Sequence, residues 1–258
     1  MEVDCQLVSF PNSRVHVAGF FARPTEPGNH RGVVVVPENV GLTEHRQAET
    51  AAMAEHGYAV LAVNLFSRVG GRPPAGPFVD DAERRRTNFL AMPDEQALGD
   101  ILAGARWLRA QPSVSGIGVL GFCSGGSQAF VAACTHPGMF DCVVSIYGNI
   151  VLPGELTRDF NPISRLRHVR GLSCPFQGHY GELDHVVPPE DVDALEQELR
   201  RYDRVAEVHR YPGAGHVFAD PGHPNHDRVA TELLWSRVYP FLAERIAAGA
   251  VPADMTAA

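Results

Sequence analysis

Short apolar runs alternate with amphipathic stretches along most of this 258-residue chain. Residues 32–36 (GVVVV) and 58–63 (YAVLAV) are almost wholly apolar, as expected of strands that are buried on both faces. Between them, residues 43–56 have helical spacing, and Gly57 suits the end of a helix. This alternation predicts an α/β fold, a mostly parallel twisted sheet with helices on both faces.

The other elements follow from the same reasoning. Residues 6–10 and 15–22 alternate polar and apolar side chains before two prolines, which predicts an antiparallel pair of strands at the N-terminal edge of the sheet. Residues 65–92 are rich in Gly, Pro and Arg and give only a weak helical signal near residues 80–90. Further strands are predicted at 117–122, 142–147, 174–179 and 206–211. One further helix is predicted from Asp94, as its N-cap, to Pro112, which ends it. Others are predicted at 125–135, 189–202 and 227–246.

Composition limits the classes of protein to which the chain can belong. The 22 basic and 30 acidic residues give a net charge of −8, which disfavours nucleic acid and anionic membranes as partners. No apolar run reaches the roughly 18 residues of a membrane span, and the start (MEVDCQLVSF) is acidic where a signal peptide is basic, so we expect a cytoplasmic protein. The size predicts a single domain over residues 1–258, with a tail that frays from about residue 248.

Cys123 has a sequence context that the other four cysteines lack. It lies in GFCSGG, between a predicted strand and a predicted helix, where a G-x-nucleophile-x-G turn projects its central side chain out of the sheet. Such a turn needs very small residues two positions away, here Gly121 and Gly125. The helix N-terminus favours a thiolate, so Cys123 is the candidate nucleophile. Ser124, one position later, is expected to supply only its backbone N–H to an oxyanion hole.

A nucleophile of this kind needs a base and a group that orients the base. Asp184 follows the strand predicted at 174–179, at the end of the sheet where α/β proteins place their sites. His216 lies in a loop of small residues (YPGAGHVF) after the strand predicted at 206–211. The chain order of nucleophile, acid and histidine is that of α/β-hydrolases, which predicts a triad of Cys123, Asp184 and His216.

These segments together resemble the dienelactone hydrolases, also called carboxymethylenebutenolidases. The resemblance rests on GFCSGG, on the G-x-x-D-x-x-V-P pattern at Asp184 and on AGHVFAD around His216, and it covers roughly residues 5–245. It implies an α/β-hydrolase fold and a Cys-His-Asp triad that hydrolyses small enol-lactones and related esters without a cofactor.

The resemblance also implies roles for residues after the third strand. Glu38, in VVVVPENVG, matches a glutamate that touches the resting thiol and helps to make it a thiolate. The N–H of the next residue, Asn39, would form the oxyanion hole together with that of Ser124.

The chain departs from the family where a substrate carboxylate would bind. Type members use two arginines, of which the first has a counterpart near Arg86, with Arg84 or Arg85 as alternatives, and the second position is Asp220. A carboxylate there repels an anionic substrate, so we expect a shifted specificity. Two further candidates for substrate contact are Phe122, beside the nucleophile, and His185, beside the acid.

Three functions stay open at the level of sequence. The first is hydrolysis of a small activated ester or (enol-)lactone through an acyl-thioester intermediate. The second is a non-hydrolytic cyclisation or isomerisation of a biosynthetic intermediate in the same pocket, and the third is a catalytically silent protein that binds a small ligand. The histidines of residues 216–226 fit no metal signature, so no metal is expected. The resemblance implies that there is no cofactor, and we expect a monomer or a homodimer.

Overall fold

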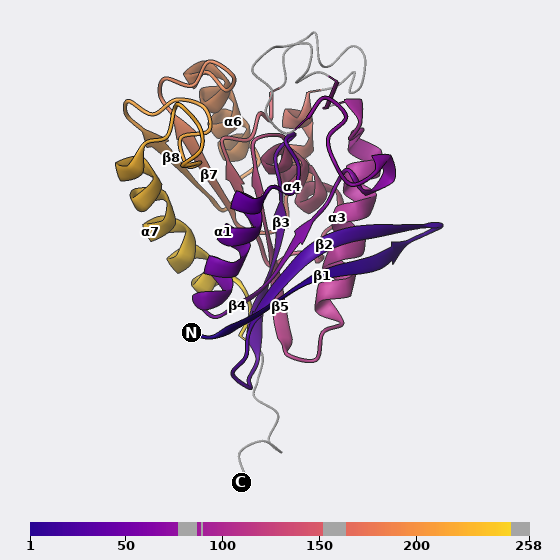
Figure 1. Cartoon of the computed structure of the whole chain (residues 1–258). Helices are drawn as coiled ribbons and strands as arrows, with labels where there is room; N and C mark the ends of the chain where they lie inside the picture. Colours follow the sequence, from indigo (N-terminus) through magenta and orange to yellow (C-terminus); the bar gives the residue numbers. More distant parts are fainter. Residues whose placement is uncertain (77–86, 89, 152–163, 249–258) are drawn as a thin grey trace.

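The computed structural model describes residues 1–76, 87–88, 90–151 and 164–248 (Figure 1). Within these residues, one sheet of eight strands has the order β1-β2-β4-β3-β5-β6-β7-β8. The pairings of β2 with β1 and with β4 are antiparallel, and all the others are parallel. The predicted fold is therefore confirmed, including its antiparallel N-terminal edge. That the whole chain is a single domain stays a prediction.

The elements lie close to their predicted positions. The strands are β1 Val3–Asn12, β2 Val15–Pro24, β3 His30–Val36, β4 Tyr58–Val63, β5 Val114–Phe122, β6 Cys142–Ile146, β7 Phe176–Gly181 and β8 Ala206–Tyr211. The α-helices are α1 Glu44–Glu55, α3 Asp94–Arg109, α4 Ser124–Thr135, α6 Pro189–Arg201 and α7 Arg228–Arg245. Two short 3-10 helices, η1 Ser67–Val69 and η2 Arg165–Gly171, lie in the connections.

The prediction that Asp94 is the N-cap of α3 is wrong. Pro93, not Asp94, occupies the N-cap of α3 and makes no side-chain capping bond. The Asp94 carboxylate instead accepts two hydrogen bonds from the buried guanidinium of Arg165, at 2.6 and 3.0 Å. A bidentate pair with a guanidinium is stronger than a neutral capping bond, so the tertiary contact decides the role of this carboxylate.

Helices cover both faces of the sheet. In Figure 1, α1 and α7 lie on one face, and α3, α4 and α6 lie on the other. Strand β3 shows how one segment serves both layers: Val33 and Val35 join the core beneath α1 and α7, while Val34 and Val36 join the core beneath the other three helices. This is the period-2 alternation of a strand that is buried on both sides.

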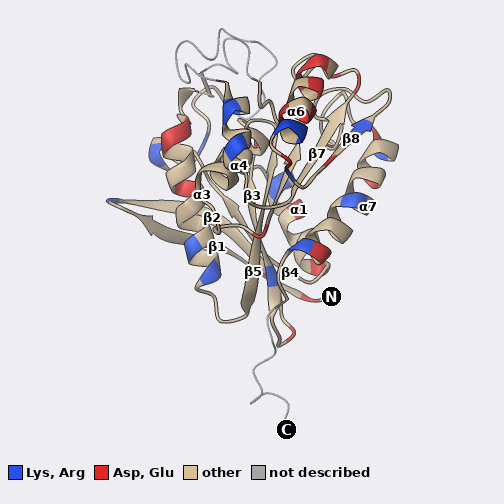
Figure 2. Cartoon of the chain, turned by 180° about the vertical axis from the view of Figure 1, so that it is seen from behind, with Lys and Arg blue, Asp and Glu red and all other residues tan. Residues whose placement is uncertain are grey.

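Charged residues are distributed along the helices (Figure 2). Both α3 and α6 have acidic residues in the first turn and arginines in the last turn, the arrangement that complements the helix dipole. None of the helices in the described residues has the length and apolar character that crossing a bilayer requires.

Candidate active site

Four of the predicted site residues lie at one edge of the sheet. Cys123 follows β5, Glu38 lies just after β3, Asp184 lies in the loop after β7, and His216 lies in the loop after β8. These strands are parallel, so their carboxyl ends meet at the same edge. Segments far apart in the sequence thereby deliver their side chains to a common site.

The turn at Cys123 has the strained geometry that the motif predicts. Its backbone φ is 50° and ψ is −121°, a conformation rare for any residue with a side chain. A Cβ at Gly121 would lie 2.2 Å from the carbonyl oxygen of Gly125, and one at Gly125 would lie 2.2 Å from that of Val36. Only glycine fits at these two positions, where β3, β5 and the start of α4 converge.

Cys123, His216 and Asp184 form a continuous chain of contacts. Nε2 of His216 lies 3.2 Å from Cys123 Sγ, and Nδ1 lies 2.7 Å from Asp184 Oδ2. The other oxygen of Asp184 accepts the backbone N–H groups of Val186 and Val187, at 2.7 and 2.9 Å. His216 is 8% exposed and Asp184 is 2% exposed. The loop that carries the acid thus fixes its orientation, and the acid fixes the imidazole.

The electrostatics of the site favour a protonated His216. Burial alone would lower the pKa of its imidazole, but the negative charge of Cys123 and the hydrogen bond to Asp184 outweigh burial and raise the pKa to about 10. An imidazolium at hydrogen-bond distance from the sulfur stabilises a thiolate, which is the nucleophilic form of cysteine. The arrangement therefore favours a charged imidazole beside the Cys123 sulfur.

Glu38 is buried beside the site but pairs with a residue other than the thiol. Its Oε1 accepts a hydrogen bond from Arg46 Nη2 at 2.9 Å, and within the described residues its Oε2 has no hydrogen-bond partner. No hydrogen bond joins Glu38 to Cys123 in this part of the chain. A buried ion pair thus holds Glu38, and its contact with the resting thiol, which the resemblance implies, stays a prediction.

Sequence reasoning missed Arg46. Its side chain is 1% exposed and lies in the first turn of α1, on the buried face that also carries Thr50 and Met53. A charged residue on the inward face of an amphipathic helix was the signal that could have revealed it.

Tyr147, directly after β6, is a second residue that the sequence analysis missed. It has a φ of 40°, its side chain is fully buried, and its ring packs edge-to-face against that of His216 at 5.3 Å. Burial raises the pKa of its hydroxyl, which has no hydrogen-bond partner among the described residues. Its position after a buried strand at the carboxyl edge was the available signal.

The two residues predicted for the oxyanion hole follow β3 and β5, at the same edge of the sheet as Cys123. Ser124 is the first residue of α4 and is buried, and Asn39 is half-buried in the turn after β3. Among the described residues, neither backbone N–H has an acceptor, so both are free to bind an oxyanion.

The residues predicted to contact a substrate differ in their exposure. Phe122 is 1% exposed and packs in the core, and its contact with a substrate stays a prediction. A residue just before the elbow is still inside the sheet, which explains the burial. His185 is exposed beside Asp184, and Arg86 lies outside the described residues. Asp220 accepts the N–H of Gly222 at 2.8 Å and lies 3.7 Å from His45 Nε2.

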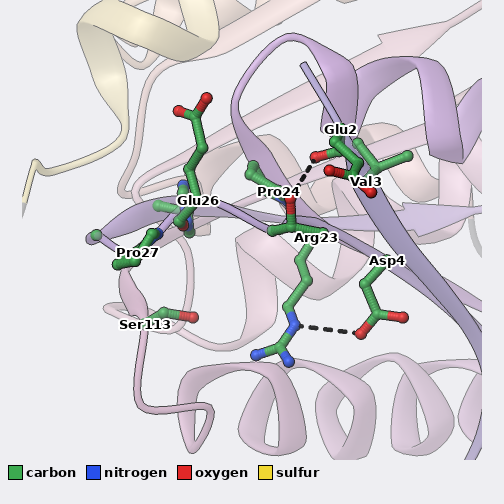
Figure 3. A pocket seen from close by; sticks show the side chains of 11 residues that line it. Glu2, Val3, Asp4, Arg23, Pro24, Glu26, Pro27 and Ser113 are labelled. Carbon is green, nitrogen blue, oxygen red and sulfur yellow. Dashed lines mark hydrogen bonds and ion pairs between the residues drawn. The ribbon is translucent and has the colours of Figure 1, made fainter.

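A cavity of about 490 Å³ lies at the other end of the strands (Figure 3). Its lining includes His30, at the start of β3, and Ser113, just before β5. An exposed ion pair, Arg23 with Asp4 at 3.6 Å, crosses it. It contains no nucleophile paired with a base, so its residues are not a candidate for catalysis. In the described residues, no group of three or more His, Cys, Asp or Glu side chains could hold a metal ion.

Comparison with known proteins agrees with this fold. The sequence model of the dienelactone hydrolase family matches residues 17–246. A protein of Escherichia coli O157:H7 named "Putative carboxymethylenebutenolidase" is 28% identical over 89% of this chain and 83% of its own length. A Bradyrhizobium protein named "Probable 2-oxo-3-(5-oxofuran-2-ylidene)propanoate lactonase" is 26% identical over 86% of this chain and 87% of its own.

A solved structure shares the architecture. The crystal structure titled as a putative dienelactone hydrolase from Klebsiella pneumoniae has a TM-score of 0.86 and 25% identity, and the alignment covers 95% of this chain and 100% of that one. With the family match extending from β2 to the end of α7, the chain belongs to the dienelactone hydrolase family.

Proposed function

We propose that this protein hydrolyses a small activated ester or (enol-)lactone through an acyl-thioester on Cys123. The observation that carries the proposal is the chain of contacts from Cys123 Sγ through His216 to Asp184, at 3.2 and 2.7 Å. Buried hydrogen bonds hold both the acid and the base, so the base is oriented before a substrate arrives. Membership of the family and the lactonase name of the Bradyrhizobium relative support the same substrate class.

The reaction follows from the positions of these groups. The thiolate of Cys123 attacks the carbonyl carbon, and the N–H groups of Asn39 and Ser124 stabilise the oxyanion. The His216 imidazolium then gives its proton to the departing oxygen, which leaves an acyl-thioester and a neutral imidazole. A water molecule, deprotonated by His216, attacks the thioester carbonyl and releases the carboxylic acid, and the thiolate and imidazolium are restored.

A cysteine nucleophile limits the range of substrates. The thiolate is also a good leaving group, so the tetrahedral intermediate returns to substrate unless the other leaving group departs as readily. Esters and lactones that release a stable enolate or phenolate meet this condition, whereas amides do not. We therefore propose activated esters or lactones as substrates, and this preference of the leaving group disfavours protease activity.

Replacement of the candidate nucleophile tests the proposal. Cys123→Ala should abolish hydrolysis of p-nitrophenyl acetate and remove the acyl adduct seen by intact mass, because the variant lacks the sulfur to which the acyl group is bonded. Ser124→Ala is the matched control: its hydroxyl is buried without a partner, so only its backbone N–H is needed, and turnover should persist. Full activity of Cys123→Ala, or loss of the adduct in Ser124→Ala, would contradict the assignment.

Labelled water separates hydrolysis from a rearrangement in the same pocket. If the reaction with dienelactone runs in heavy-oxygen water, the carboxylic acid product should contain one solvent oxygen, because water resolves the acyl-thioester. A product that forms at the same rate without solvent oxygen would instead show a cyclase or isomerase. A protein that forms no adduct and turns over no ester would be a ligand-binding member of the family.

A further inference from the structure

Arg46 is a buried cation beside the site that the proposed reaction does not use. Its guanidinium donates to Glu38 Oε1 at 2.9 Å and also binds the carboxylate of Glu49 in the next turn of α1. The side chain of Arg46 is 1% exposed, that of Glu38 is 7% exposed and that of Glu49 is 11% exposed. Charges withdrawn from water to this extent are tolerated only in compensated groups, so the three residues form one electrostatic unit.

A second contact joins Arg46 to the nucleophile elbow. Its Cζ lies 3.4 Å from the ring centroid of Phe122, the residue that precedes Cys123. The Phe122 ring also packs near Tyr147 and Trp235, with centroid separations of 6.3 and 6.5 Å. A guanidinium that lies flat on an aromatic face is held by dispersion and by the ring quadrupole. Arg46 therefore connects the turn after β3 to the end of β5.

The negative charge of a carboxylate near Cys123 would oppose formation of a thiolate, and Arg46 can offset that charge. A carboxylate close to a cysteine opposes formation of a thiolate, because two negative charges repel each other in a site with little water. Glu38 keeps one oxygen buried and, among the described residues, without a hydrogen-bond partner. The other titratable or charged groups facing this centre are His45 and Glu49 on α1, Tyr147 after β6, Asp184 after β7, and His216, Asp220 and His226 after β8.

We propose that Arg46 is a positioning residue of the active site. It fixes Glu38 through one oxygen and offsets its charge, so that a thiolate can form at Cys123 beside a buried carboxylate. The aromatic contact with Phe122 keeps this cation against the elbow. The inference rests on the proposed role of Cys123. It assigns a function to a residue of α1 that acts through Glu38 and does not touch a substrate.

The rate of alkylation of Cys123 by iodoacetamide reports thiolate formation without any substrate. It is measured by peptide mass in a Cys5→Ser background, from about pH 5 to about pH 10. Arg46→Met should slow the reaction about tenfold at neutral pH and move the profile to higher pH, because Glu38 is left uncompensated. Arg46→Lys, which keeps the charge, should stay within about twofold of the parent.

Two further variants test whether Arg46 acts through Glu38. Glu38→Gln should shift the profile to lower pH, because the cation remains and the carboxylate charge is gone. The double variant Arg46→Met/Glu38→Gln removes both charges and should return most of the lost rate, a rescue that a purely packing role would not give. Should Arg46→Met not fold, the opposite shift in Glu38→Gln and the behaviour of Arg46→Lys still decide the question.

Arg68→Met is the matched control. Arg68 binds the fully buried carboxylate of Asp100 at 2.6 Å, so this variant also strips a buried acid of its guanidinium, but in η1 and α3. Its alkylation profile should equal that of the parent. An unchanged profile in Arg46→Met, no rescue in the double variant, or an equal shift in Arg68→Met would each overturn the proposal. If these shifts occur and no ester is cleaved, the proposed function fails while this inference stands.

Discussion

At the scale of single residues, the site depends on how each side chain is held. Asp184 uses one oxygen for the backbone of its own loop and the other for His216, so its orientation is set on both sides. His216 in turn lies between an acid and a sulfur. Each contact reduces the freedom of the next group, and the geometry exists before a substrate binds.

The raised pKa of His216 predicts a pH-dependent contribution to stability. A group whose pKa is higher in the folded state stabilises the fold below its unfolded pKa of 6.5, and the contribution is lost as the pH rises through about 10. The parent should therefore exceed His216→Asn in the free energy of unfolding by on the order of 4 kcal/mol more at pH 6 than at pH 10. Urea unfolding followed by circular dichroism measures this difference.

The same experiment has an internal control. Cys123→Ala removes the negative charge that contributes to the raised pKa of His216, so the pH dependence in that background should be smaller. A difference between the parent and His216→Asn that does not change with pH would mean that the pKa of the imidazole is not raised in the folded protein.

The three residues of the proposed triad were predictable because local sequence reveals them. The glycines around Cys123 and the small residues before His216 are read directly from the chain. Arg46 and Tyr147 were not predicted, since their importance comes from burial and from neighbours that are distant in sequence. Arg86 lies outside the described residues, and its role stays a prediction.

At the scale of elements, the connection from β5 to α4 is the most constrained segment. It converts a buried strand into a helix within one residue, and Cys123 takes the conformational strain at that point. The helix then begins with Ser124 and runs buried for nearly its whole length. A rigid element on each side keeps the nucleophile in position.

This convergence predicts a steep cost for a methyl group at Gly125. The added Cβ would meet the backbone oxygens of Val36 and Pro37 at 2.2 and 2.4 Å, and backbone cannot move aside cheaply. Gly125→Ala should lose about 3 kcal/mol in the free energy of unfolding together with ester turnover. Gly138→Ala is the control: its φ of 77° costs about 1 kcal/mol, but the site around it is open, so turnover should persist. A fully active and stable Gly125→Ala would show that the elbow is mobile.

Element boundaries were predicted well wherever burial and turn residues agree. The strands at 58–63 and 206–211 begin and end as predicted, and Thr43 and Gly57 delimit α1. The strand predicted at 174–179 begins and ends two residues later, at 176–181. Its later start follows from Pro175, which supplies no N–H for the ladder. The sheet order was fixed only by tertiary pairing, which places β4 between β2 and β3.

At the scale of the whole molecule, charge at the site edge predicts substrate preference. Asp220 projects from the loop after His216, and its side chain is 21% exposed. Asp220→Asn should raise kcat/KM about fivefold for p-nitrophenyl hydrogen succinate relative to p-nitrophenyl acetate, because both release the same phenolate and only one has an anionic acyl group. The gain should shrink at high salt.

Net charge must be separated from this local effect. Asp4→Asn makes the same change in charge at the amino ends of the strands, on a side chain that is 45% exposed, and should leave the preference unchanged. An equal response in both variants would assign the discrimination to the overall charge of −8 rather than to the loop.

The unequal surroundings of the cysteines have a consequence for the working life of the protein. Burial raises the pKa of Cys134, Cys142 and Cys174 and keeps them as unreactive thiols, while burial and acidic neighbours raise that of Cys5. Cys123 lies beside an imidazole instead. Peroxide oxidises thiolates first, so damage should begin at Cys123, the proposed nucleophile. Inactivation by oxidants would then precede any loss of structure, and a thiol reductant would reverse its first stage.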